Sequence, residues 1–185
     1  ADAVIARFAR DLFPESAGAL FLIAPSRDLV EAGAVWGEPS SRKEVFHPDD
    51  CWALRLGKTH VAQDPHSGPR CPHVGEPPPG GYVCVPMMAQ GEMMGILHLQ
   101  DRPRSGGADS LERAPGSQAG LRLARAFAER TALALANLRL RETLRTQSIH
   151  DPLTGLYNRR FMEETMAIEE RRAARSGSSV GIILF

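Results

Sequence analysis

The sequence predicts an α+β protein in which an antiparallel sheet is flanked by helices and continued by one long helix. Two observations support this class. Short apolar runs alternate with turn-forming residues, which is typical of strands joined by hairpins. Residues 121–150 then show helical periodicity over about 30 positions, or about 45 Å, which is more than one small domain needs for its own packing.

The N-terminal part is expected to form a helix and then a hairpin. Residues 2–12 carry apolar side chains at three-to-four spacing, typical of an amphipathic helix, and Pro14 ends it. The apolar runs 18–24 and 29–36 are separated by the turn residues 25–28. We therefore expect two antiparallel strands there.

The middle of the chain combines short elements with a long loop. Pro48 and the two aspartates behind it favour the start of a short helix that Gly57 ends, and 59–62 follows as a short strand. Residues 63–81 are rich in proline and glycine, so we expect a long loop there. Long loops inside compact domains often carry function.

A second hairpin and an insertion follow. The strands 82–88 and 92–100 are joined by the short connection Ala89-Gln90-Gly91. Residues 102–120 are rich in glycine, serine, proline and charge, which predicts a flexible insertion. The expected organisation is a core domain at 1–101, the insertion at 102–120, a connector helix at 121–150 and a further segment at 151–185.

The long helix carries two apolar stripes, and two stripes indicate two partners. We assign the first stripe to the sheet of the same domain, and it comprises Ala128, Thr131, Leu135 and Leu138. The second stripe alternates four and three residues apart, as in a coiled coil, and comprises Leu133, Asn137, Leu140, Leu144 and Gln147. We expect this second stripe to form a homodimer, with Asn137 as the polar position that sets the register.

Residues 85–99 read VPMMAQGEMMGILHL, with a Val-Pro start, two spaced glycines and an apolar end. This segment resembles the closing hairpin of GAF domains, which are relatives of the PAS fold. The run DCWALR at 50–55, followed by Gly57, His60 and Cys71-Pro72-His73, is similar to a subgroup of GAF domains attached to cyclases. The resemblance extends from residue 1 to about residue 147 and implies a small-molecule-sensing domain with a long signalling helix.

A second and more specific motif is DPLTGLYNRRF at 151–161. It resembles the D-x-L-T-G-L-x-N-R-R opening of GGDEF domains, which are diguanylate cyclase domains. Residues 161–175 then predict a helix, and 180–185 predict the start of a buried strand, in the order of that family. The resemblance implies Mg²⁺ and GTP as cofactor and substrate of a full-length cyclase that makes cyclic-di-GMP.

The chemistry of that family requires carboxylates that hold Mg²⁺ against the phosphates of GTP. The sequence contains neither the family's first metal-binding aspartate nor its F-K-x-x-N-D and G-G-[DE]-E-F segments. Phosphate-loop, nucleophile-elbow and H-E-x-x-H motifs are absent too. We therefore expect a catalytically inactive chain that has no catalytic residue, cofactor or metal of its own. Its expected role is to regulate the activity of a full-length cyclase.

The start of the GGDEF-like segment is the expected regulatory hinge. Pro152 forbids simple continuation of the long helix, and Asp151 and Thr154 are suited to cap and bend the chain there. The hinge residues implied by the resemblance are Asp151, Leu153, Thr154, Asn158 and Arg159. The alternative is that these residues only end one helix and start another.

The expected ligand space lies between the sheet and the 63–81 loop. Its candidate ligand-binding residues are Trp52, Cys71, His73, Tyr82, Cys84 and Met87, with Met94 as a further lining residue. The alternative is plain core packing, because alternating residues on a hairpin more often pack than bind.

One constellation has soft-metal or redox character, namely Cys51, His60, His66, Cys71 and His73. Zinc or haem iron accepts such ligands, but structural zinc sites usually show C-x₂₋₄-C pairs, and the Cys71-Pro72-His73 spacing is too tight for that pattern. The spacing therefore favours independent core and loop residues over a metal site. A thiol switch between Cys51 and Cys71 is a further alternative.

The amino-acid composition limits which cellular compartment and which binding partners are expected. Lys plus Arg equals Asp plus Glu, at 22 each, so charge offers no argument for nucleic acid or an anionic membrane as a partner. Three cysteines without framework spacing favour a reducing, cytoplasmic compartment. No apolar run approaches the ~20 residues of a membrane span. Because the chain starts at Ala1 and stops inside an apolar run, we interpret it as a piece of a longer protein.

Three functions are therefore weighed. The first is a sensory and dimerisation module that regulates cyclic-di-GMP synthesis in response to a small ligand or to redox state. The second is a non-catalytic interaction protein with a degenerate GGDEF domain. The third is a metabolic enzyme on a GAF scaffold, such as a methionine sulfoxide reductase, against which the long exit helix argues.

Overall fold

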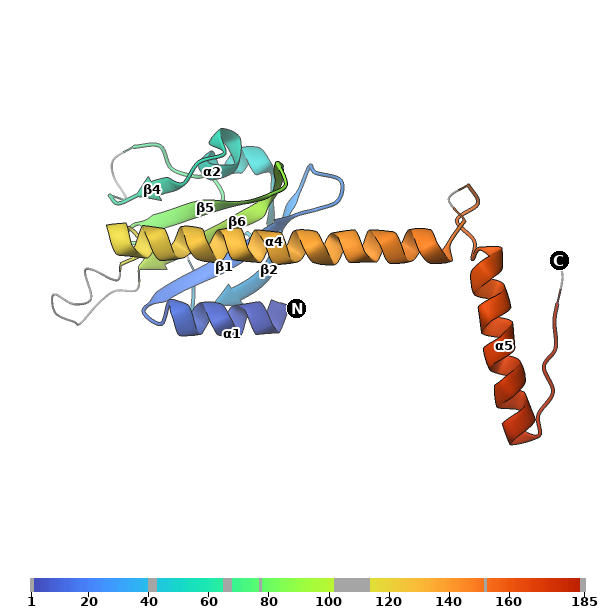
Figure 1. The fold of residues 1–185 in the computed structure, drawn as a ribbon. Coiled ribbons are helices and arrows are strands. Elements are labelled where there is room, and N and C mark those ends of the chain that lie inside the picture. The colour runs from blue at the N-terminus through green and yellow to red at the C-terminus, as the bar shows by residue number, and fades with distance from the viewer. Residues whose placement is uncertain are drawn as a thin grey trace. The chain divides into compact units, whose positions relative to one another are not determined.

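The computed structural model describes residues 2–39, 43–64, 68–76, 78–101, 114–151 and 153–183. The chain forms two compact units, Ala1–Ala136 and Asn137–Phe185 (Figure 1). The first unit holds the sheet, and the second holds the segment with the DPLTGLYNRRF motif.

The first unit is built on a six-stranded antiparallel sheet with the strand order β3-β2-β1-β6-β5-β4. Its strands are β1 (Ser16–Ile23), β2 (Val30–Trp36), β3 (Val45–Phe46), β4 (His60–Ala62), β5 (Tyr82–Ala89) and β6 (Glu92–Asp101). Its helices are α1 (Asp2–Leu12), the short 3₁₀ helix η1 (Pro48–Asp50), α2 (Trp52–Leu56) and the first part of α4 (Gln118–Ile149). The predicted class, an antiparallel sheet flanked by helices, is confirmed.

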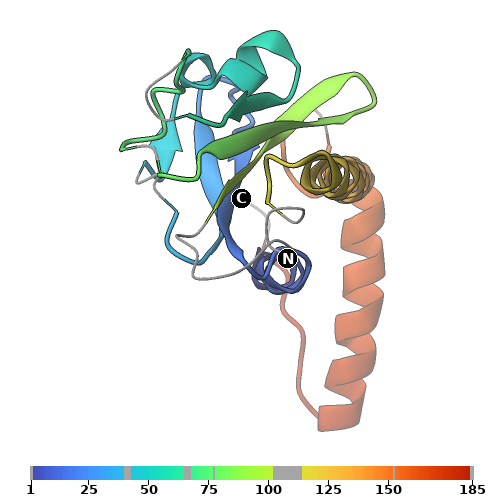
Figure 2. The ribbon, with the colours of Figure 1, turned by 90° about the vertical axis from the view of Figure 1, so that its left-hand side faces the viewer.

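The two faces of the sheet are covered differently, as Figure 2 shows. α1 and α4 cover one face, and the buried residues there form what we call the helix-side cluster, including Ala9, Phe13, Leu20, Trp36, Val83, Val85, Met87, Leu97, Leu99, Ala124, Ala128 and Ala132. α2 and the 68–76 segment cover the other face. The buried residues there form the loop-side cluster, including Ala19, Phe21, Val30, Phe46, Cys51, Ala53, Cys71, Val74, Tyr82, Cys84 and Ile96.

Strand β5 contributes buried residues to both clusters. Tyr82 and Cys84 belong to the loop-side cluster, whereas Val83 and Val85 belong to the helix-side cluster. Successive side chains of a strand point to opposite faces, so a strand that is buried on both sides reads as a continuous apolar run. This explains why the run from residue 82 onward contains few polar residues.

The short helix after Pro48 is divided in two. The sequence predicts one helix from Pro48 to Gly57, but the structure has η1, then Cys51 with extended backbone angles (φ −123°, ψ 118°), then α2. Gly57 ends α2 with φ 62°, as the sequence predicts. The extended residue interrupts the helix and places Cys51 in the buried loop-side cluster.

The closing hairpin turns over two residues rather than the expected three. Gln90 and Gly91 both have positive φ, 53° and 80°, as a two-residue type I′ turn requires. The ladder between β5 and β6 then shifts by one residue between Met87 and Met88. This bulge decides which residues of β6 lie opposite those of β5.

Helix α4 begins at Gln118, three residues before the predicted start. The Ser117 hydroxyl accepts a hydrogen bond from the Gly120 amide at 3.0 Å, which satisfies one of the free amides of the first turn. Most of the predicted flexible insertion, residues 102–113, lies outside the described residues. None of the described helices is long and apolar enough to cross a membrane.

The first apolar stripe of α4 packs on the sheet over most of its predicted length. Ala128 and Thr131 are buried, and Leu135 packs against the helix-side cluster. Leu138, however, is 52% exposed and belongs to the second unit. Within the first unit, the stripe therefore packs against the helix-side cluster as far as Leu135.

The second unit contains the end of α4 and helix α5 (Arg159–Ser176), which extends the predicted 161–175 helix by a few residues. The predicted strand from Val180 is not formed in residues 180–183, and Ile183 is 85% exposed. A strand needs a neighbour that takes up its backbone hydrogen bonds, and no described part of this unit supplies one.

Candidate functional site

Four buried side chains that can ligate a metal meet beneath the loop-side face of the sheet. They are Cys51, Cys71, His73 and Cys84, and we call them the Cys₃His cluster. One ligand atom from each side chain lies within 4.8 Å of the others, and all four side chains are 0% exposed. Residues from three separate parts of the chain therefore converge on one point.

Local structure positions each member of this cluster. Cys51 precedes α2, and its carbonyl oxygen accepts the first helical hydrogen bond from the Arg55 amide at 3.0 Å. Cys71 begins a tight turn in which its carbonyl accepts from the Val74 amide at 3.0 Å, which brings His73 back toward the sheet. Cys84 lies in the middle of β5.

Hydrogen bonds hold the cluster to its surroundings. The Trp52 amide donates to Cys71 Sγ at 3.4 Å, and the Cys71 amide donates to the Tyr82 hydroxyl at 2.7 Å. Cys84 Sγ lies 3.6 Å from His73 Nε2 and 3.5 Å from His98 Nδ1. A fifth polar side chain, His98, thus contacts the cluster from β6.

Aromatic rings close the cluster from the side. The Phe46 ring stacks on the His73 imidazole with ring centres 4.5 Å apart and an angle of 12° between the planes. Phe21 meets both rings edge-on. This packing fixes the orientation of the His73 ring, so its Nε2 atom is held toward Cys84.

The cluster changes the acidity of its own members. Hydrogen bonding, first from Cys51 and then from Cys84, lowers the pKa of Cys71, whereas the bond to Cys71 raises the pKa of Cys51 to about 12. Burial raises the pKa of Cys84 and lowers the pKa of His98 to about 3. Cys71 is therefore the most acidic of the three thiols.

The structure brings together only some of the predicted site residues. Cys71, His73 and Cys84 join the cluster, and Tyr82 and Trp52 contact it through the hydrogen bonds described above. Met87 lies in the helix-side cluster on the opposite face of the sheet, as does Met94. His60 lies on β4 outside the cluster, and His66 lies outside the described residues.

His98 is the residue that sequence reasoning missed. It is directly opposite Cys84 in the ladder between β5 and β6. Counting back from the turn would place Leu97 opposite Cys84, because the bulge after Met87 shifts the register by one. The residue opposite Cys84 can be predicted from the sequence by counting along the hairpin. That count gives His98 only if the position of the bulge is known.

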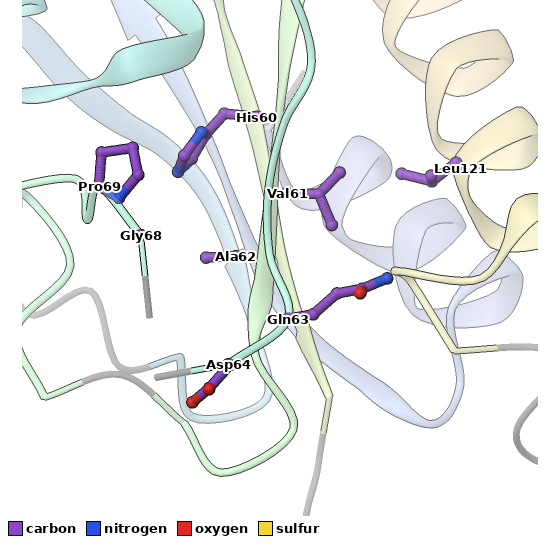
Figure 3. Close-up of a pocket in the computed structure, with 8 residues that line it drawn as sticks. All are labelled: His60, Val61, Ala62, Gln63, Asp64, Gly68, Pro69 and Leu121. Atoms are coloured by element: carbon purple, nitrogen blue, oxygen red, sulfur yellow. The ribbon is translucent and has the colours of Figure 1, made fainter. Parts of the chain in front are cut away.

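A separate surface pocket of about 460 Å³ lies at the edge strand β4. Its lining residues are His60, Val61, Ala62, Gln63, Asp64, Gly68, Pro69 and Leu121. In Figure 3, His60 and Ala62 project toward the 68–69 segment, whereas Val61 projects to the other side of the strand, toward Leu121. The pocket therefore wraps around one strand, and its described lining includes none of the predicted ligand-binding residues.

Comparison with known proteins identifies both parts of the chain. The family model described as GAF domain matches residues 3–135, and the model described as diguanylate cyclase, GGDEF domain, matches residues 148–185. The chain belongs to the GAF domain family. It continues into the start of a GGDEF domain, so both predicted resemblances are confirmed. No curated protein matches the sequence.

Solved structures share the fold of the GAF domain at low sequence identity. The GAF domain/HD domain protein from Geobacter sulfurreducens is 20% identical, with 75% of this chain and 91% of that chain covered and a TM-score of 0.53. The second GAF domain of DevS from Mycobacterium smegmatis is 19% identical, with coverages of 76% and 96% and a TM-score of 0.51. A type II free methionine-R-sulfoxide reductase from Thermoplasma acidophilum is 14% identical, with coverages of 71% and 86% and a TM-score of 0.52.

The GGDEF motif forms the turn between α4 and α5. Asp151 Oδ1 accepts hydrogen bonds from the Leu153 amide at 3.1 Å and from both the amide and the hydroxyl of Thr154 at 2.9 Å. The bond from the Thr154 amide contributes most to lowering the pKa of Asp151. Gly155 completes the turn with φ 71°. Asp151 and Thr154 therefore organise the turn.

The cap of α5 itself is Asn158. Its Oδ1 accepts from the Phe161 amide at 2.9 Å, while its Nδ2 donates to the Ser148 carbonyl oxygen at 2.7 Å. One side chain thus ties the start of α5 to the end of α4. The two remaining hinge candidates are peripheral, since Leu153 is 92% exposed and Arg159 makes an exposed ion pair with Glu163 at 2.8 Å.

Replacement of Asn158 by alanine is expected to loosen the first turn of α5 by about 1 kcal/mol, the usual value of a helix cap. Amide exchange at Phe161 should then accelerate about 5-fold, because 1.4 kcal/mol corresponds to a factor of 10. Asn158→Asp keeps the acceptor oxygen and loses only the bond to Ser148, so Phe161 should stay protected. Equal protection of Phe161 in the wild type and in the alanine variant would refute this assignment of the cap.

Proposed function

We propose that this chain is the sensory and regulatory module of a bacterial diguanylate cyclase, in which it controls the synthesis of cyclic-di-GMP from GTP. One observation carries the proposal. Helix α4 starts in the core of the GAF domain, where Ala124 and Ala128 are fully buried, and it ends at the motif that opens the GGDEF segment. One continuous helix in the sequence therefore links the GAF domain to the start of the GGDEF domain.

The proposed output signal is the geometry of a helix pair. Leu133, Leu140 and Leu144 are 48%, 50% and 56% exposed, and they repeat at coiled-coil spacing together with the exposed Asn137. Leucines that stay half exposed along one stripe can be buried by a second copy of the helix. A homodimer would bring two GGDEF domains together, which a reaction that joins two GTP molecules requires.

The turn after α4 is proposed as the point where this geometry reaches the catalytic domain. The network around Asp151 and the two-sided bonds of Asn158 make the joint short and well defined. A change in the phase of the paired helices would therefore be transmitted to the GGDEF domain as a shift between two packings. Mg²⁺ and GTP belong to the complete GGDEF domain, and the input is a small ligand or a redox change in the GAF domain.

Dimerisation through α4 makes a direct prediction. The double variant Leu140→Asp/Leu144→Asp places charges in the apolar seam, so it should convert a dimer of the 185-residue chain into a monomer by multi-angle light scattering. Leu138→Asp is the matched control, because Leu138 is equally exposed, at 52%, but lies off the seam. A double variant that remained dimeric, or a control that became monomeric, would contradict this interface.

The regulatory role is tested with the chain followed by a complete GGDEF domain. At protein concentrations where the wild type is dimeric, the double variant should make cyclic-di-GMP from GTP at least about 10-fold more slowly, because its catalytic domains no longer meet. The Leu138→Asp control should keep wild-type activity. Full activity of a monomeric variant would exclude control through the helix pair, and a wild type that makes no product would favour a non-catalytic interaction module.

A further inference from the structure

We propose that Cys51, Cys71, His73 and Cys84 bind one Zn²⁺ ion in a closed, four-coordinate site. The ion would fix α2 and the 68–76 segment to the middle of the sheet. This inference concerns the GAF domain alone and does not depend on the proposed cyclase regulation.

The four ligand atoms surround a single point at which a metal ion can bind. Around tetrahedral zinc, with Zn–S about 2.3 Å and Zn–N about 2.0–2.1 Å, neighbouring donor atoms lie roughly 3.5–3.8 Å apart. Cys84 Sγ and His73 Nε2 are 3.6 Å apart, and the four ligand atoms all lie within 4.8 Å of one another. A small contraction of the cluster therefore gives the coordination distances.

The donor set selects the class of metal. Three thiolates and one imidazole form a Cys₃His set, which occurs in structural zinc sites, and soft sulfur ligands disfavour Mg²⁺ and Ca²⁺. All four ligands come from the protein and are fully buried. No coordination position faces solvent, so the site is structural rather than catalytic, and its burial leaves no room for a haem.

Hydrogen-bond donors near the ligating sulfur atoms would stabilise the negative charge of the bound site. Each thiol that binds the ion releases its proton to solvent, so Zn²⁺ with three thiolates carries one net negative charge. The Trp52 amide donates to Cys71 Sγ at 3.4 Å, and His98 Nδ1 lies 3.5 Å from Cys84 Sγ, where its N–H can donate. Such bonds to ligating sulfur stabilise the thiolates, which makes His98 a positioning residue.

The location gives the ion a mechanical role. Cys51 precedes α2, Cys71 and His73 come from the long loop, and Cys84 comes from β5. The loop itself has no strand pairing between residues 68 and 76. A single ion would therefore join two covering segments to the sheet, in addition to the apolar contacts that Cys71 and Val74 make in the loop-side cluster.

The first experiment uses the complete 185-residue chain purified under reducing conditions without chelator. Elemental analysis should find one zinc ion per chain. Removal of the ion with a strong chelator should lower the melting temperature by roughly 10 °C or more, and added Zn²⁺ should restore it. Co²⁺ added to the metal-free chain should give the visible ligand-field and thiolate charge-transfer bands of a tetrahedral sulfur-rich site.

Variants separate ligation from general packing. Cys71→Ser and His73→Gln should each lower the affinity for Zn²⁺ more than 100-fold, and His98→Phe should lower it about 10- to 100-fold, as loss of an outer-shell partner does. The matched control is His47→Gln, because His47 is exposed and makes no capping hydrogen bond with its side chain. The control should bind one ion with wild-type affinity.

Several results would overturn the proposal. These are a zinc-free wild type that takes up neither Zn²⁺ nor Co²⁺, a melting temperature that does not respond to the chelator, or a Cys51–Cys71 disulfide as the resting state. The wild-type measurements decide the matter even where a ligand variant fails to fold. Failure here would leave the dimer and cyclase predictions untouched, and failure of those predictions would leave the metal site standing.

Discussion

The Gly95→Ala variant is expected to lose about 4 kcal/mol of folding free energy, enough to unfold a domain of ordinary stability in part. Gly95 lies in β6 opposite Leu22 of β1, with φ 155°, a conformation that other residues rarely adopt. An added methyl group would overlap with the backbone carbonyl oxygen of Phe21 and lie 3.0 Å from the Leu22 Cα atom. Because β6 is held between β1 and β5, neither strand can retreat.

Gly91→Ala provides the control for this prediction. Gly91 also has a positive φ, 80°, but no atom lies within 4 Å of the position that its added methyl group would take. Its substitution should therefore cost only about 1 kcal/mol of backbone strain. Urea unfolding followed by circular dichroism measures both values. A Gly95→Ala variant as stable as Gly91→Ala would show that the two central strands do not approach as closely as described.

The second large effect is expected where α4 docks on the sheet. Ala124, Ala128 and Ala132 recur every four residues and are all 0% exposed, so small side chains let the helix lie close to the strands. Ala128→Phe inserts a ring where no space exists and should destabilise the GAF domain by about 3 kcal/mol. The same substitution should expose the buried face of α4 to amide exchange, because it forces the helix away from the helix-side cluster.

The control for this second prediction is Ala126→Phe, on the exposed side of the same helix. It changes the same residue type to the same ring two positions away and should alter the free energy of unfolding by less than about 0.5 kcal/mol. Comparable losses in both variants would indicate that helix propensity, rather than docking, determines the effect. In a full-length cyclase, Ala128→Phe should also uncouple the GAF domain from the output.

The order of helices and strands in the GAF domain was predictable from local pattern. The amphipathic helix 2–12, the first hairpin and the closing hairpin all appear at or within a few residues of their expected places. The two-residue strand β3 was missed, because Val45–Phe46 is too short to show a period. The strand expected from Val180 failed for a different reason: a strand is defined by its partner and not by its own residues.

The turn at the GGDEF motif was determined by the sequence alone. Asp151, Thr154, Gly155 and Asn158 act through hydrogen bonds and backbone angles within about ten residues, so a linear motif contains everything that the turn needs. The same holds for the apolar spacing of α4, which marks both the face that packs on the sheet and the face that remains exposed. Local interactions are specified by local sequence.

The Cys₃His cluster is what only the tertiary structure decided. Cys51, Cys71 and Cys84 are far apart in the chain and match no metal-binding spacing, and their meeting depends on an extended residue before α2, a tight turn after Cys71 and the fold of the sheet. The bulge after Met87 then turns His98, rather than Leu97, toward the same face. Because side chains alternate between the faces of a strand, a one-residue shift exchanges every contact, and no local pattern records it.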